Sequence, residues 1–112
     1  MKIYKHGEVI IKAVKNENAK ITGKEIKGNR DLILADSETT GNHHMLQVIE
    51  GVHTYRDEDL DKFFVRPEVE TKIYCKLDNR HTDLILKKGY TYEIEKAKEW
   101  DHLEQEIRNV RD

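Results

Sequence analysis

The stretch Leu34-Ala35-Asp36-Ser37-Glu38-Thr39-Thr40-Gly41-Asn42-His43-His44-Met45-Leu46 decides the fold and also holds the densest set of chemical groups in the chain. The run at 31–35 is apolar after Asp31, polar residues follow, and strand-like residues resume at 44–49. This pattern predicts two strands joined by a turn at Gly41-Asn42. The continuous apolar run at 31–35 favours a strand that is buried on both faces or that closes a barrel.

Other strand-like runs extend this pattern over most of the chain. They lie at 8–14, 44–49, 63–65, 70–77, 83–86 and 90–95, with a weaker one at 20–22 and a turn at 24–30. A further run at 52–55 is expected to close a hairpin across Glu50-Gly51. About eight short strands at roughly ten-residue spacing predict a mostly-β fold, a small antiparallel barrel or sandwich. Near the end, Trp100, Leu103, Ile107 and Val110 share one helical face, so a short C-terminal helix is expected.

Composition limits the classes of protein that fit this sequence. A chain of 112 residues fits a single domain, residues 1–112. The 20 basic and 22 acidic residues nearly cancel, which argues against nucleic acid or a membrane surface as partner. No stretch approaches the ~20 apolar residues of a membrane span, and the first residues lack a signal-peptide core. A cytoplasmic location is therefore expected, or the host cytoplasm if the gene is viral; homo-oligomerisation stays open.

The adjacent pair His43-His44 resembles a metal motif, but strand geometry weakens that interpretation. Successive side chains of a strand point to opposite faces, so only one of the two can reach a given site. His44 shares its face with Asn42, an amide that is a poorer metal ligand than a second imidazole.

A second polar segment at 78–83 is predicted to meet the first one in space. Asp78 and His81 would join His44 in a set of two histidines and one carboxylate, suited to zinc, iron or manganese. Glu38, Asn42 and Tyr90 are the candidate ligand-binding residues beside this metal set. The alternative is that these are ordinary polar loop residues, with His44 hydrogen-bonded beside the core and Tyr90 in a core or edge position.

The remaining candidates carry weaker signals. His6, His53 and His102 are expected to be solvated. Cys75, the single cysteine, excludes an intrachain disulfide and a multi-cysteine zinc site, and it alternates with Ile73 as a small buried residue.

The order of these pieces resembles a family of small uncharacterised proteins of bacteria and their phages. That family has a Gly-Glu-x-Thr-Gly-His-x-His turn and a later His-x-x-His; the counterparts in this chain are Gly7-Glu8-Val9-Ile10, Glu38-Thr39-Thr40-Gly41 with His44, His81, Leu86-Lys87-Lys88-Gly89-Tyr90, Glu99-Trp100 and Val110-Arg111-Asp112. The resemblance implies that the four motif histidines are metal ligands or a polar cluster. This chain keeps His44 and His81 but has Asn42 and Asp78 at the other two positions. The family also has a Gln-x-Glu-aromatic step near its end, where this chain has Ala97 in place of the glutamine.

Three functions follow from these observations. The first is a non-catalytic module, phage-encoded if the resemblance holds, that binds a small ligand or a divalent metal such as zinc. The second is a metal-dependent enzyme that uses His44, His81 and Asp78 as ligands and Glu38 as general base. The third is a phage structural or protein-interaction domain without a metal.

Overall fold

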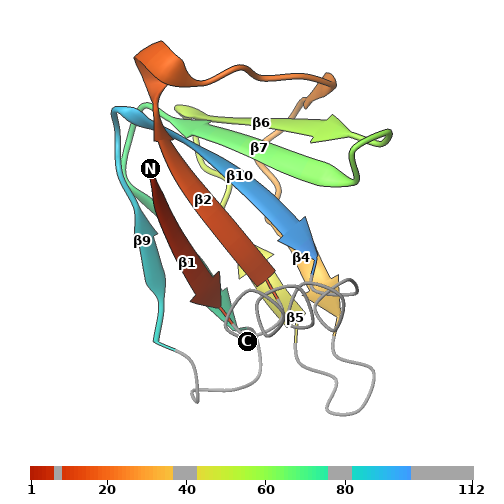
Figure 1. The fold of residues 1–112 in the computed structure, drawn as a ribbon. Coiled ribbons are helices and arrows are strands. Elements are labelled where there is room, and N and C mark those ends of the chain that lie inside the picture. The colour runs from red at the N-terminus through yellow and green to blue at the C-terminus, as the bar shows by residue number, and fades with distance from the viewer. Residues whose placement is uncertain (7–8, 37–42, 76–81, 97–112) are drawn as a thin grey trace, which may run out of the picture.

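The computed structural model describes residues 1–6, 9–36, 43–75 and 82–96, which form two antiparallel β-sheets (Figure 1). The larger sheet has six strands in the order β1-β2-β10-β7-β6-β3. Its strands are β1 (Lys2–His6), β2 (Val9–Lys15), β3 (Lys24–Ile26), β6 (Val52–Asp57), β7 (Lys62–Pro67) and β10 (Tyr90–Lys96). A short 3-10 turn, η1 (Asn16–Asn18), follows β2.

The smaller sheet has four strands in the order β4-β5-β8-β9. They are β4 (Leu32–Asp36), β5 (His43–Leu46), β8 (Thr71–Cys75) and β9 (Leu84–Leu86). β4 pairs antiparallel with β5, as the sequence pattern around Gly41-Asn42 predicts. The turn residues themselves lie outside the described ranges.

The hydrophobic core lies between the two sheets and takes side chains from both. β2 and β10 contribute Ile11 and Ile94, while β5 and β8 contribute Leu46 and Ile73, each at most 1% exposed. Figure 1 accordingly shows β1, β2 and β10 in front of the strands of the smaller sheet. The mostly-β prediction is confirmed as two antiparallel sheets, whereas a closed barrel is wrong for the described strands. No helix among the described residues has the length and apolar character that a membrane crossing needs.

A β-bulge explains the continuous apolar run in β4. Ile33 pairs with Met45 and Ala35 pairs with His44, so Leu34 is an extra residue between two ladder positions. Leu34 and Ala35 are both buried although they are adjacent, while Ile33 is 50% exposed. The run is therefore not buried on both faces, because the bulge turns two consecutive side chains toward the core.

Three other local predictions differ from the structure. The segment 2–6 was not recognised as a strand, and the predicted turn at 24–30 begins with β3. The chain between β5 and β6 crosses from one sheet to the other, so the predicted hairpin across Glu50-Gly51 is wrong. Gly51 makes this crossing with φ +91°, and its carbonyl accepts the Glu68 N–H at 2.7 Å. The predicted C-terminal helix lies within 97–112, outside the described residues, and nothing in the described ranges supports it.

Candidate metal centre

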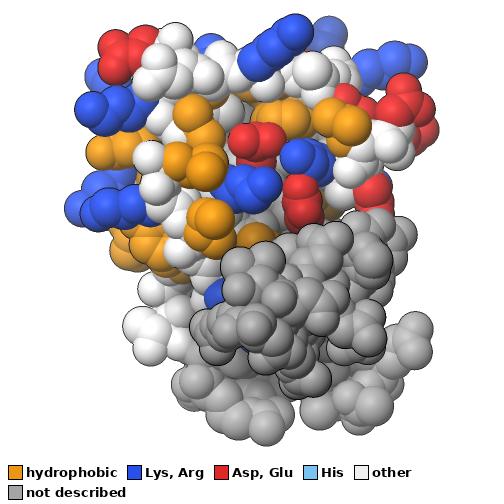
Figure 2. Space-filling view, viewed as in Figure 1, with side chains coloured by type: hydrophobic (Ala, Val, Ile, Leu, Met, Phe, Trp, Pro, Cys, Tyr) orange, Lys and Arg blue, Asp and Glu red, His pale blue; other side chains and the backbone are white. Residues whose placement is uncertain are grey.

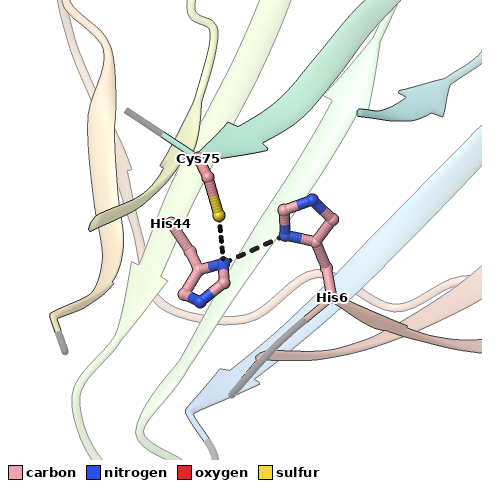
Figure 3. Close-up of side chains that lie close together, drawn as sticks. All are labelled: His6, His44 and Cys75. Atoms are coloured by element: carbon pink, nitrogen blue, oxygen red, sulfur yellow. Dashed lines mark hydrogen bonds between the residues drawn. The ribbon is translucent and has the colours of Figure 1, made fainter. Parts of the chain in front are cut away.

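Three side chains from three strands converge at one end of the sandwich, and they define the candidate metal centre: His6, His44 and Cys75 (Figure 3). His6 ends β1 of the larger sheet, whereas His44 and Cys75 belong to β5 and β8 of the smaller one. Their ligand atoms all lie within 4.8 Å of one another. Within the described part of the chain, this is the one convergent group of three histidine, cysteine or acidic residues.

Strand register places each of the three side chains. His44 and Cys75 are direct partners across the β5–β8 ladder, which brings their Cβ atoms close on a shared face. His6 pairs with Val9, a core residue with no exposed surface, so its ring also points between the sheets. His6 and His44 are each only 4% exposed, and Cys75 is half-buried.

The two imidazoles face each other through the same kind of nitrogen. Nδ1 of His6 lies 3.0 Å from Nδ1 of His44, with the rings nearly perpendicular. Sγ of Cys75 lies 3.5 Å from that same His44 nitrogen. Figure 3 shows the sulfur and the His6 ring both directed at His44. Two ring nitrogens at 3.0 Å repel each other if both present lone pairs, so either a hydrogen-bonding proton or a cation must lie between them.

The backbone fixes the proton of the His6 ring. Nε2 of His6 lies 3.1 Å from the carbonyl oxygen of Thr82. A carbonyl only accepts, so Nε2 carries the hydrogen and donates it. In the neutral ring this leaves the lone pair on Nδ1, aimed at His44.

The likeness of this chain to known proteins extends over most of the two described sheets. A family model matches residues 5–97. The chain belongs to the DUF8820 family, a domain of unknown function. The matched range contains His6, His44 and Cys75, and it agrees with the expected membership of an uncharacterised family. Neither a curated protein nor a solved structure matches the chain.

In this DUF8820 domain, the site residues that the sequence predicts do not lie together in one place. His44 is in the centre, and His43, on the opposite face of β5, is less buried. Tyr90 lies elsewhere: it pairs with Lys15 at one end of β2, while His6 pairs with Val9 at the other. The remaining predicted residues, Glu38, Asn42, Asp78 and His81, are outside the described ranges.

Two members of the centre differ from their predicted environment. His6 was expected to be solvated but is buried between the sheets. Cys75 does face the same side of β8 as the core residue Ile73, yet its sulfur contacts the His44 imidazole. Among the other histidines, His53 is partly exposed between two glutamates, with Nε2 3.5 Å from Glu68, and His102 lies outside the described residues.

One signal in the sequence could have identified His6. Residues 2–6 can fold back on the apolar run from Val9 across the Gly7-Glu8 step, which pairs His6 with a core position. No comparable signal joins His6 to β5, because that contact is made between two different sheets.

Proposed function

We propose that this domain binds a single zinc-class cation through Nδ1 of His6, Nδ1 of His44 and Sγ of Cys75. The observation that carries the proposal is the convergence of these three ligand atoms within 4.8 Å from both sheets. Two imidazoles and a thiolate are ligands that suit zinc and do not suit the hard cations magnesium and calcium.

The distances support a tetrahedral cation. With zinc about 2.0–2.1 Å from nitrogen and about 2.3 Å from sulfur, tetrahedral ligands lie roughly 3.3 Å apart for two nitrogens and roughly 3.6 Å for nitrogen and sulfur. The corresponding separations are 3.0 Å and 3.5 Å. Small movements of the rings therefore suffice to form two edges of the coordination shell.

The hydrogen bond from His6 to Thr82 gives independent support. Histidine ligands commonly donate their second ring N–H to a backbone carbonyl, which fixes the tautomer and orients the ring. His6 donates through Nε2 in this manner, so Nδ1 is prepared for a metal. A bound cation would also replace the proton that the two facing Nδ1 atoms otherwise need.

Burial favours a resident metal over a catalytic one. Both histidines are 4% exposed, so a substrate has little access to a cation from their side. Three protein ligands leave a fourth position, for which Asp78 and His81 stay predictions from the sequence. A metal-dependent enzyme would instead keep that position open for water or substrate.

Elemental analysis of tag-free protein tests the proposal. We expect about one zinc per chain in the wild type, and loss of the metal in His44→Gln and Cys75→Ala, because each variant removes one of the three proposed ligands. Cobalt substitution should give a sulfur-to-cobalt charge-transfer band that Cys75→Ala abolishes. His53→Gln is the matched control, since His53 lies outside the centre and should leave the metal in place.

Other outcomes separate the alternatives. Metal-free protein whose melting temperature does not respond to zinc or chelator would refute the proposal and leave the interaction domain. Metal retained by Cys75→Ala but lost in Asp78→Asn and His81→Ala would shift the site to the set predicted from sequence. Metal that is lost in His44→Gln and also in Asp78→Asn or His81→Ala would identify the fourth ligand.

A further inference from the structure

A cavity of about 260 Å³ opens at the end of the sandwich opposite the candidate metal centre. Its lining comes from β1, β2 and β10, from Ile85 in β9 and from Lys87, which follows β9. Lys2, Ala13 and Tyr92 form one row across three adjacent strands of the larger sheet. Because alanine stands between two long side chains, the row is hollow at its centre.

The cavity is basic. Lys2, Lys15 and Lys87 line it, and none of the described residues that line it is acidic. Among the described residues, none of these three lysines has an ion-pair partner. Ammonium groups of one sign around a hollow with low-dielectric walls concentrate an anion there. Figure 2 shows hydrophobic and Lys or Arg side chains next to one another along the left edge of the molecule, beside β1 and β9.

The walls are aromatic. Tyr4, Tyr90 and Tyr92 line the cavity, with the Tyr90 and Tyr92 ring centroids 6.2 Å apart. Tyr92 is 4% exposed and forms the floor, while Tyr90 is 37% exposed at the mouth. The Tyr92 hydroxyl accepts the Lys87 N–H at 2.9 Å, which leaves its own proton to donate. Burial raises the pKa of Tyr92, so this hydroxyl keeps its proton at neutral pH.

We propose that this cavity binds a small planar anion of the aromatic carboxylate class. The tyrosine rings contact the flat face of the ligand, and the lysine ammonium groups hold its carboxylate. The volume is below the roughly 300–1,000 Å³ of pockets for drug-sized molecules, so a ligand with a single ring fits. This site does not depend on the metal centre. Lys15 lies at the cavity end of β2 and Val9 at the end next to His6; the two residues are six positions apart, about 20 Å along the strand.

A titration of the full chain, followed by two-dimensional NMR, tests this site with three probes. Benzoate should bind saturably, with shifts at Tyr90, Tyr92 and Lys87. Benzamide has the same shape without the charge and should bind on the order of tenfold more weakly. Acetate has the charge without the ring and should not saturate.

Variants connect the binding to the cavity. Lys87→Gln should weaken benzoate binding about fivefold, whereas Lys88→Gln, the adjacent exposed lysine outside the cavity, should leave it within about twofold. Ala13→Val fills the hollow and should abolish binding, and dispersed amide signals will show that it is folded. Lys15→Gln replaces Lys87→Gln if the latter does not fold.

The proposal is overturned if benzamide or acetate binds as well as benzoate, or if no probe saturates. Equal weakening by Lys87→Gln and Lys88→Gln would likewise overturn it, because only general surface charge would then be at work. Benzoate binding should persist in Cys75→Ala. The benzoate titration can therefore fail while the metal proposal holds, and the metal analysis can fail while benzoate still binds.

Discussion

At the scale of single residues, the carboxylate of Asp31 joins β8 to the segment that follows β5. Its Oδ1 accepts the Val48 N–H at 2.9 Å, and its Oδ2 accepts the Tyr74 hydroxyl at 2.6 Å. The hydrogen bond to Asp31, together with burial and the negative charge of that carboxylate, raises the pKa of Tyr74 to about 12. The phenol proton is therefore held more tightly in the folded state than in the unfolded chain.

The first prediction concerns this phenol at alkaline pH. A raised pKa contributes stability that is complete below the ordinary tyrosine value of 10.0 and is lost as the pH rises from there through about 12. Asp31→Asn should move the Tyr74 titration, followed by ultraviolet absorbance, toward 10.0 and remove this alkaline loss of stability. Tyr74→Phe identifies the signal, since Asp31→Asn should have no such effect in that background. A Tyr74 midpoint that stays in place in Asp31→Asn would contradict the assigned cause.

At the scale of elements, the strands with strong apolar patterns could be predicted and the irregular ones could not. β8 and β10 alternate clearly, and their predicted ranges overlap the observed strands. β1 is an edge strand with mostly exposed side chains, so period-two hydrophobicity is weak there. The bulge at Leu34 is invisible in the sequence, because a run of apolar residues fits a strand buried on both faces equally well.

The one-sided burial of β4 gives a second prediction, with two adjacent residues as matched variants. Leu34 is 1% exposed, so Leu34→Ala should lower the free energy of unfolding by about 2–5 kcal/mol. Ile33 is 50% exposed on the other face, so Ile33→Ala should cost less than about 1 kcal/mol. Urea denaturation measures both. Similar costs for the two variants would mean that the strand is buried on both faces, as the continuous apolar run predicts.

At the scale of the whole molecule, the candidate metal centre depends on how the two sheets meet. Strand alternation selects His44 over its neighbour and turns Cys75 inward, so two of the three side chains could be placed on a face from sequence. The third, His6, comes from the other sheet, and its distance from His44 in the chain is 38 residues. Local patterns carry no information on such a contact. The predicted partners Asp78 and His81 lie outside the described residues and stay predictions.

The final prediction follows from this arrangement and rests on the proposed metal. His6 lies on the larger sheet while His44 and Cys75 lie on the smaller one, so a bound cation would join the sheets at that end. A cation that binds only when the sheets are assembled adds folding stability by mass action. At free zinc one hundred times its Kd, the free energy of unfolding should rise by about 2.7 kcal/mol over chelator-treated protein. Urea denaturation at both zinc levels measures the gain, which should vanish in Cys75→Ala and persist in His53→Gln. A gain that survives in Cys75→Ala would place the stabilising cation elsewhere, and no gain in the wild type would mean that zinc does not connect the sheets.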